Sequence, residues 1–502
     1  FIPLLNSLSN IRLRYSGLVN FASRILSVAT GLMFTILVTR RLNEELFGAW
    51  QFYLSLLNYF IVPSSIVNYW LTRDMGRGRK VARSGIVFSG TISMISAILF
   101  VFLSPVFRES VSIDTQTFFA FTFWIIVMCC ASSLEAICHG IQPQTVGYGV
   151  IVFEISKVIF GAFMVGYLKY SLFGAVLSID LALVIQIFFY LLRISKHLRE
   201  KLSFRDIERW LRTSWIPLIS TLPWLVFLQD AVVVTLISGS LLPIAYIRAA
   251  NIFTGVISFS GTLAVGLYPK LLSGGSEKDI EESLELVLLF LIPMVFGQFI
   301  LAEPLLYVLR KEYAFTYNVL RIMVIGSAIG TMKGIFSTII LGLEKTDVNE
   351  NPSWRSFAKS YLMKIPLAEL LGSIAYVVMI SAFASILSSL GSALLISLST
   401  VISLLIVNTS LMLYYVKTSR RLISFGLNLK RVAKFLLSAL FMTIVILIFY
   451  PESAKSEQIL TVLFSLIPVI LIAVPVYFTS LLLIDGDSRN LFKNAFKTLR
   501  IL

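Results

Sequence analysis

Apolar stretches of about 20 residues recur along the whole chain, and each is long enough to cross a membrane as a helix. We count fourteen of them in 502 residues, near 17–39, 47–68, 84–104, 117–138, 145–166, 171–192, 213–238, 242–268, 286–309, 317–342, 363–388, 391–416, 434–451 and 458–484. Only 14% of the residues are charged and 57% are hydrophobic, whereas about a quarter of the residues of soluble domains are charged. The sequence therefore predicts an all-α polytopic membrane protein.

Positive charges are distributed unevenly between the connections that join these stretches. With the N-terminus placed in the cytoplasm, the cytoplasmic connections and both tails hold 30 Lys or Arg residues. The opposite side holds 7, and the Arg40-Arg41-Leu42 turn is its one local exception. Cytoplasmic loops carry such an excess, so we expect a plasma-membrane protein with both termini in the cytoplasm. The net charge of +15 then needs no nucleic-acid partner.

Aromatic and basic residues mark the expected cytoplasmic interface. Indole rings favour this interface, and four tryptophans fall near the predicted cytoplasmic ends of spans: Trp70, Trp210, Trp215 and Trp354. The segment YWLTRDMGRGRK, residues 69–80, ends the second span. We expect Arg73, Arg77 and Arg79 to serve orientation at the interface, so they are weaker candidates than Arg24 for contact with a substrate.

The chain repeats itself with a shift of 196 residues. This shift lays residues 39–53 on 235–249 and Gly78 on Gly274. Six spans followed by six in the same orientation are a common plan of alternating-access transporters. We therefore expect two six-helix lobes related by a pseudo-twofold axis, with a cavity between them, and two extra helices. The expected parts are residues 1–197 for the N-terminal lobe, 198–212 for an amphipathic surface linker, 213–417 for the C-terminal lobe, and 418–502 for the last two spans and the tail.

Several kinds of chemistry find no support in the sequence. There is no GxxxxGK[ST] motif for ATP, so any transport is secondary or driven by the substrate gradient. Cys129, Cys130 and Cys138 lack a CxxC spacing and have only two histidines as possible co-ligands, so we expect buried thiols and no metal. Asp485-Gly486-Asp487 resembles the DxD of glycosyltransferases, but its place after the last span predicts a solvated helix terminus. We expect no cofactor and no enzymatic activity.

Seven ionisable residues inside the spans are the candidate functional residues. Such residues normally face the interior of a helix bundle or a water-filled cavity, because hydrocarbon cannot solvate them. The cations are Arg24, Lys157, Arg248 and Lys333, and the acids are Glu154, Asp180 and Asp230.

Sequence spacing predicts partners for four of the seven. Glu154 and Lys157 are three residues apart on one helix, which favours a structural ion pair. Asp230 and Arg248 lie nine residues either side of a turn near Gly239, so we expect them at one depth on adjoining helices and close to each other. Asp180 has no evident partner and is either a ligand of a coupling ion or a helix-packing contact.

Arg24 and Lys333 also have no partner nearby in sequence, and they come from opposite lobes. Two uncompensated cations that face one cavity suit an anion, and the guanidinium group matches phosphate or pyrophosphate best. Alternatively, each side chain extends to the cytoplasmic interface, which lies about 10 Å from Arg24 at 1.5 Å per helical residue.

A family resemblance rests on SRIL with its arginine in the first span, then TRRLNEELFGAWQF and YWLTRDMGRG, and in the second half on Asp230, AYIRAANIF and LYPKLL. These motifs resemble those of Wzx-type polysaccharide flippases of the MOP exporter superfamily. The resemblance implies a V-shaped transporter that moves a polyprenyl- or dolichyl-(pyro)phosphate-linked oligosaccharide to the outer leaflet. Arg24 matches the family's first-span cation, and Arg248, Lys333 and Lys157 are cavity candidates by position.

Two alternatives stay open. A cation-coupled drug exporter of the same fold would use Asp180 and Asp230, with Glu154, as Na⁺ or H⁺ sites. A membrane-embedded glycosyltransferase is disfavoured, because no external loop offers an acidic catalytic pair and there is no catalytic histidine. The expected partners are a lipid-linked oligosaccharide and membrane lipids, and glycan-assembly proteins are left open.

Overall fold

The computed structural model describes residues 13–39, 44–105, 113–227, 229–240, 242–309, 311–346, 354–389, 391–450 and 459–489. Every regular element in these ranges is a helix, and eleven of them are long and apolar enough to cross a membrane. The chain is thus a multi-pass membrane protein, and the predicted all-α class is confirmed. The expected Arg40-Arg41-Leu42 turn lies outside the described residues.

The chain divides into two compact units. One consists of Phe1–Thr221 with Val265–Gly275, and the other of Leu222–Ala264 with Ser276–Leu502. The segment Val265–Gly275, which the repeat places in the second lobe, therefore groups with the first unit.

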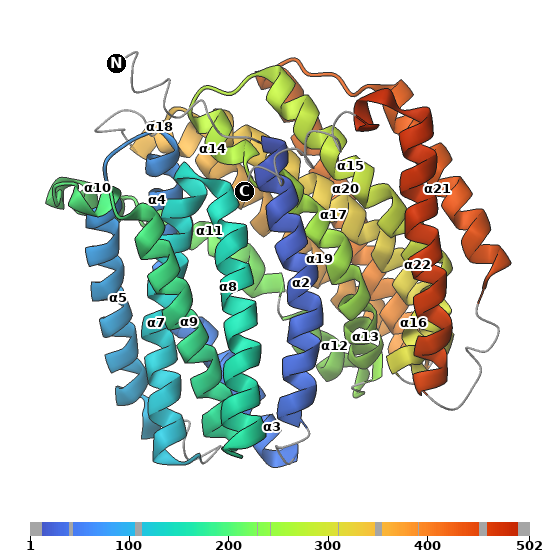
Figure 1. The fold of residues 1–502 in the computed structure, drawn as a ribbon, viewed down its shortest axis with the longest axis horizontal. Coiled ribbons are helices and arrows are strands. Elements are labelled where there is room, and N and C mark those ends of the chain that lie inside the picture. The colour runs from blue at the N-terminus through green and yellow to red at the C-terminus, as the bar shows by residue number, and fades with distance from the viewer. Residues whose placement is uncertain are drawn as a thin grey trace. The chain divides into compact units, whose positions relative to one another are not determined.

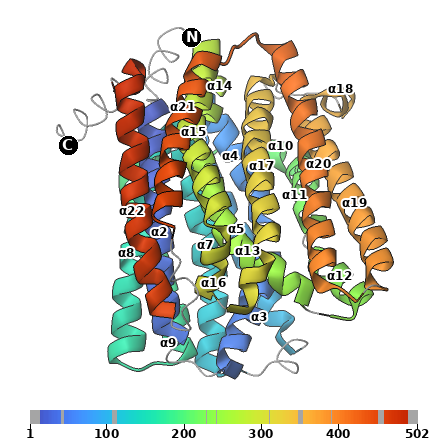
Figure 2. The same cartoon turned by 90° about the vertical axis from the view of Figure 1, so that its right-hand side faces the viewer.

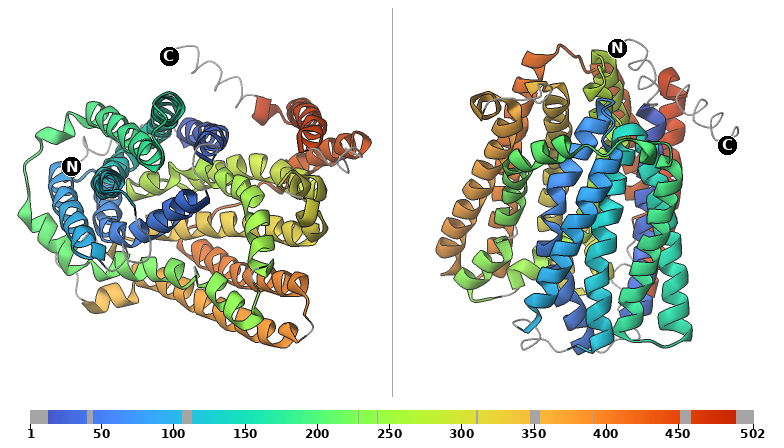
Figure 3. Two further views of the ribbon diagram at one scale, coloured as in Figure 1. Left: turned by 90° about the horizontal axis from the view of Figure 1, so that it is seen from below. Right: turned by 90° about the vertical axis from the view of Figure 1, so that its left-hand side faces the viewer.

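Long helices of the first unit run alongside one another, while the short α10 crosses their end (Figures 1 and 3). The second span is broken between α3 and α4 at Pro63, which has no N–H to donate to the helix ladder. The helices of this unit are α2 (Leu13–Thr39), α3 (Glu44–Ile61), α4 (Ser64–Gly76), α5 (Ala82–Phe102), α7 (Thr115–Ile141), α8 (Pro143–Gly161), α9 (Leu172–Ile194), α10 (Phe204–Arg212), α14 (Leu267–Leu272) and most of α11 (Trp215–Phe227).

The second unit holds the remaining helices, most of which run side by side in Figure 2. α21 and α22 pack on each other and on the unit through a shared apolar core that includes Phe435, Tyr477 and Leu289. The helices are α12 (Asp230–Ser238), α13 (Leu242–Ser258), α15 (Glu277–Ile300), α16 (Ala302–Leu309), α17 (Tyr317–Leu343), α18 (Trp354–Lys359), α19 (Tyr361–Ser388), α20 (Ala393–Leu422), α21 (Leu429–Ile448) and α22 (Ile459–Ile484).

Gly78 and Gly274 support the internal repeat. Each lies two residues beyond a short helix, α4 or α14, and each has a positive φ, of 76° and 98° respectively. Residues with a Cβ rarely adopt this conformation, so both helices are followed by a glycine in the left-handed region.

α2 and α8 approach each other closely in the first unit. A Cβ on Gly147 would lie 2.9 Å from the Val19 side chain and 3.1 Å from the Asn20 backbone. The Asn20 side chain donates to the Pro143 carbonyl at 2.8 Å. Small and polar residues of this kind hold membrane helices together where the hydrophobic effect cannot, and they fix the face of α2 that carries Arg24.

The end of α4 is a buried polar junction, which corrects the expected interface role of Arg73. Arg73 is fully buried and donates to the Tyr268 hydroxyl of α14 at 2.9 Å. Asp74 is buried too and accepts hydrogen bonds from Arg209 and, at 2.9 Å, from the Trp210 indole of α10. Trp70 and Trp210 are 3% and 0% exposed, so both are core residues. Buried polar partners, which composition does not reveal, decide their position.

Asp485 is a buried carboxylate, which corrects its prediction as part of a solvated helix terminus. It pairs with Arg431 at 3.2 Å and Lys434 at 3.0 Å, and Arg431 also pairs with Glu285 of α15. Burial raises the pKa of Asp485, but hydrogen bonds from Ser488 and Lys434 and the charge of Arg431 outweigh burial and lower it from 3.8 to about 2. The cluster ties α21 and the end of α22 to α15.

Asp485→Asn should destabilise the protein at neutral pH by about 2 to 3 kcal/mol, because Arg431 and Lys434 lose their shared charge partner. Asp487→Asn, which changes the exposed acid of the same motif, should have little effect. Thermal unfolding midpoints in detergent measure both variants.

The difference between wild type and Asp485→Asn should also depend on pH. The pKa of Asp485 is lower in the folded state, so its stabilisation is complete above pH 3.8 and is lost as the pH falls toward 2. The difference in midpoint should therefore be constant from pH 5 to 8 and shrink below about pH 4. A difference that does not change with pH would contradict an ionised Asp485.

Candidate functional site

Arg24 lies on α2 and is partly exposed. Its charge acts on the carboxyl of Glu135 on α7 and on Tyr190 of α9. Glu135 is not among the residues expected from the sequence, although an acid inside the apolar run 115–141 is the signal that marks it. Arg24 is therefore not electrostatically isolated, since its charge acts on a carboxyl of the same unit.

Glu154 and Lys157 of α8 form the predicted ion pair, with 2.6 Å between Nζ and Oε2. Thr30 of α2 donates to the same carboxylate oxygen at 2.6 Å. The Lys157 ammonium also lies over the rings of Phe34 and Phe153, 5.8 and 5.1 Å from their centroids. With its side chain only 11% exposed, Lys157 serves the packing of α2 on α8 more than the binding of a ligand.

Asp180 of α9 is fully buried, and neither carboxylate oxygen has a hydrogen-bond partner within the described ranges. Neighbouring Ile179 packs against apolar residues of α7, among them Val127. An ionised carboxylate without a partner is costly in such surroundings.

The Asp230–Arg248 pair of the second unit confirms the predicted approach of these two residues. Arg248 Nη2 lies 2.7 Å from Asp230 Oδ1, and the Tyr376 hydroxyl also bonds to Asp230. Gly239 has a φ of +62°, which lets the connection between α12 and α13 turn tightly. Asp230 is 3% exposed and the Arg248 side chain 42% exposed, so the acid lies beneath the cation.

Lys333 has a partner, contrary to its expected role as an uncompensated cation. Its ammonium lies 2.8 Å from Glu369 Oε2 of α19, and Tyr415 of α20 donates to the other oxygen of Glu369 at 3.0 Å. Glu369 is the second acid not expected from the sequence. Helix packing brings together two residues that are 36 positions apart, and no local spacing reveals such a pair.

Metal chemistry finds no support in the part of the chain that the structure describes. No group of three or more His, Cys, Asp or Glu side chains there could hold a metal ion. Cys129 and Cys138 are buried free thiols, and Cys130 is partly exposed.

No protein-family model and no curated protein sequence matches the chain. Solved structures do match, and they are transporters of the MATE family and MOP superfamily. An outward-facing multidrug resistance MATE transporter aligns with a TM-score of 0.60 at 13% identity, over 83% of this chain and 98% of its own. A MATE transporter in the straight conformation aligns with a TM-score of 0.65 at 12% identity, over the same shares.

A third match is a MOP superfamily transporter from Pyrococcus furiosus, for which a reverse polarity of the binding pocket suggests a different function. It aligns with a TM-score of 0.56 at 14% identity, over 84% of this chain and 95% of its own. These similarities show that the chain has the MATE-like fold.

Arg248→Gln should cost more stability than Asp230→Asn, because it leaves a buried carboxylate without its cation while the reverse change leaves a half-exposed arginine. The double variant should be more stable than the sum of the single effects predicts, by about 1 to 3 kcal/mol. Thermal midpoints of the purified variants give these values. Combining Asp230→Asn with Lys333→Gln should be additive, because Lys333 pairs with Glu369.

Proposed function

We propose that this protein is a flippase that moves a polyprenyl- or dolichyl-(pyro)phosphate-linked oligosaccharide from the cytoplasmic to the outer leaflet by alternating access. In this proposal, arginines inside the spans attract the phosphate group, and Asp230 holds Arg248 in place. The protein makes and breaks no covalent bond of its substrate.

The observation that carries the proposal is the half-exposed guanidinium of Arg248 within a membrane-spanning helix. A cation at such a position faces water or a ligand, because hydrocarbon cannot solvate it. The buried Asp230 fixes the guanidinium from one side and leaves other N–H groups available. Guanidinium binds phosphate oxygens in a bidentate manner, so an arginine fixed in this way is a pre-organised phosphate receptor.

Arg24 is the corresponding arginine of the first unit. It is partly exposed, and Glu135 acts on it through charge, without a direct ion pair among the contacts that the structure describes. Lys333 is a weaker candidate than either arginine, because Glu369 already occupies its ammonium group and its side chain is 17% exposed.

The extra helices also support a lipid-linked substrate. The matched transporters align over 95% to 98% of their own chains but over only 83% or 84% of this one. The remaining share of this chain is about as large as residues 418–502, which hold α21 and α22. In Wzx-type flippases the last two helices form a groove for the lipid tail. The Pyrococcus furiosus transporter supports the further point that pocket charge distinguishes functions within this fold.

Arg24→Ala should lower the rate of lipid-linked oligosaccharide translocation in reconstituted vesicles by about tenfold to 100-fold, the value of a charge-assisted hydrogen bond. Arg24→Lys should recover part of the rate, because it keeps the charge but loses bidentate geometry. Size-exclusion profiles confirm that each variant is folded.

Arg321→Gln is the matched control for Arg24→Ala. Arg321 is a span cation that donates to the Phe299 carbonyl at 3.1 Å and lies over the Tyr317 ring at 4.8 Å. This variant should translocate at close to the wild-type rate. Wild-type translocation by folded Arg24→Ala would overturn the proposed role of Arg24.

A second candidate function, a cation-coupled exporter, is favoured by Asp180 alone. Asp230 and Glu154, its other proposed ion sites, are already paired with Arg248 and Lys157. We infer that a coupling ion at Asp180 would be H⁺, because both carboxylate oxygens are buried without a hydrogen-bond partner among the described residues, and a proton removes the cost of burying the charge.

Asp180→Asn should fold normally, because the carboxyl oxygens have no described hydrogen bond to lose. If the protein is proton-coupled, the variant should transport at a rate that no longer depends on a pH gradient across the vesicle membrane. Ser178→Ala changes a buried residue of the same helix that bonds only within it, and it should keep the wild-type response. An unaltered response of Asp180→Asn would assign Asp180 to helix packing.

A further inference from the structure

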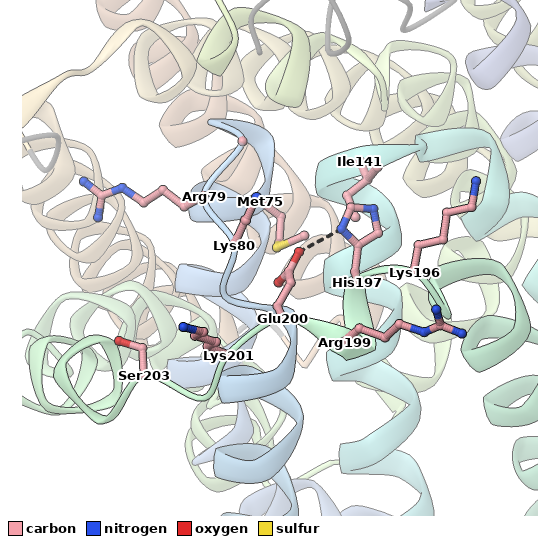
Figure 4. A pocket seen from close by; sticks show the side chains of 11 residues that line it. Met75, Arg79, Lys80, Ile141, Lys196, His197, Arg199, Glu200, Lys201 and Ser203 are labelled. Carbon is pink, nitrogen blue, oxygen red and sulfur yellow. Dashed lines mark hydrogen bonds and ion pairs between the residues drawn. The ribbon is translucent and has the colours of Figure 1, made fainter. Parts of the chain in front are cut away.

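A cavity of about 790 Å³ opens at the end of the first unit where α4 meets α5. Three connections form its wall: the turn after α4, the end of α7 at Ile141, and residues 196–203 between α9 and α10. Met75, which is 2% exposed, lies beside Ile141 at the centre of the view in Figure 4, and charged side chains surround them. The cavity is distinct from the span residues of the proposed function.

The lining of this cavity is strongly cationic. It carries one carboxylate, Glu200, and five lysines and arginines: Arg79, Lys80, Lys196, Arg199 and Lys201. Both oxygens of Glu200 are already engaged, one by the Ala82 backbone N–H at 3.1 Å and the other by His197 Nδ1 at 2.9 Å. Lys196, Arg199 and Lys201 make no ion pair among the interactions described. Arg79 also lies 3.6 Å from Asp74, so the excess of positive charge rests on Lys80, Lys196, Arg199 and Lys201, and it suits an anionic ligand.

The connection that carries these cations is held in a defined position. The Ser203 backbone N–H donates to the Ser84 hydroxyl at 2.9 Å, and Glu200 binds the first residue of α5. The Trp210 indole of the following helix α10 donates to Asp74 of α4 and so holds α10 in place. The cationic side chains thus project from an anchored backbone, and binding a ligand costs less ordering entropy than it would on a free loop.

The cavity lies at the depth where lipid head groups are found. α5 begins at Ala82 and α9 ends at Ile194, so two spanning helices end beside it. α10 crosses this end of the unit (Figure 1). Phe204 and Leu211, seven residues apart on one face of α10, are 73% and 53% exposed. A short helix with apolar residues exposed on one face and a buried anchor on the other suits a membrane interface.

We propose that this cavity binds the phosphate head group of an anionic phospholipid. Membrane lipids and soluble polyphosphates share the phosphate group, and the cations alone would bind either. The exposed apolar face of α10 and the partly exposed Ile141 favour the lipid, because a lipid has glycerol and acyl carbons that can contact them and a soluble polyphosphate does not. The site is independent of the proposed transport function.

The test is lipid binding by the full-length protein purified in detergent, titrated with phosphatidylglycerol or with zwitterionic phosphatidylcholine and followed by native mass spectrometry. The variant Lys196→Gln/Arg199→Gln/Lys201→Gln removes three exposed cations. It should weaken phosphatidylglycerol binding by about tenfold to 100-fold, because each basic residue near anionic lipid contributes roughly fivefold. Phosphatidylcholine binding should not change.

The matched control is Lys417→Gln/Arg420→Gln/Arg421→Gln, which removes three exposed cations from the end of α20 in the other unit. It should leave phosphatidylglycerol binding at the wild-type level. An equal loss in both variants would show general charge attraction and overturn the site, as would no loss in either. Inorganic pyrophosphate tests the soluble alternative. If pyrophosphate binds the wild type without displacing phosphatidylglycerol, or if pyrophosphate binds and phosphatidylglycerol does not, the lipid assignment is wrong.

Discussion

The absence of water inside a membrane is the constraint on which the polar structure of this protein depends. Hydrocarbon cannot solvate a charge, so every ionisable group in a span needs a partner or a wet surface. Arg248, Lys157 and Lys333 each have a carboxylate within ion-pair distance, and the charge of Arg24 acts on Glu135. Arg248, Lys157 and Lys333 are therefore fixed by their partners, and what distinguishes them is how much of each side chain stays exposed.

Most of the fold could be predicted from the sequence because apolar runs of membrane length have few alternatives to helix. Each of the fourteen predicted stretches contains described helix, although several are interrupted, as the second span is between α3 and α4. Partners close in sequence could be predicted as well. Glu154 and Lys157 share a helix face, and Asp230 and Arg248 flank a tight turn. In such cases helix geometry alone sets the distance, and no knowledge of packing is needed.

Partners far apart in sequence could not be predicted, because helix packing decides them. Lys333 of α17 pairs with Glu369 of α19, and Asp485, just after α22, pairs with Arg431 of α21. The same reason explains Arg73 and Trp210, which have the composition of an interface but lie in a buried junction. A charged or aromatic residue at a span end is compatible with a wet surface or with a satisfied core, and only the partner distinguishes the two.

The grouping of Val265–Gly275 with the first unit has a mechanical consequence. The chain passes between the units inside α11, again at the end of the 3₁₀ helix Phe259–Ala264, and again after Gly275. An α-helix is stiff, whereas 3₁₀ geometry has weaker hydrogen bonds and glycine has a wide range of backbone angles. The backbone on either side of α14, where the chain passes between the units, should therefore bend more easily than α14 itself, which is packed in the first unit.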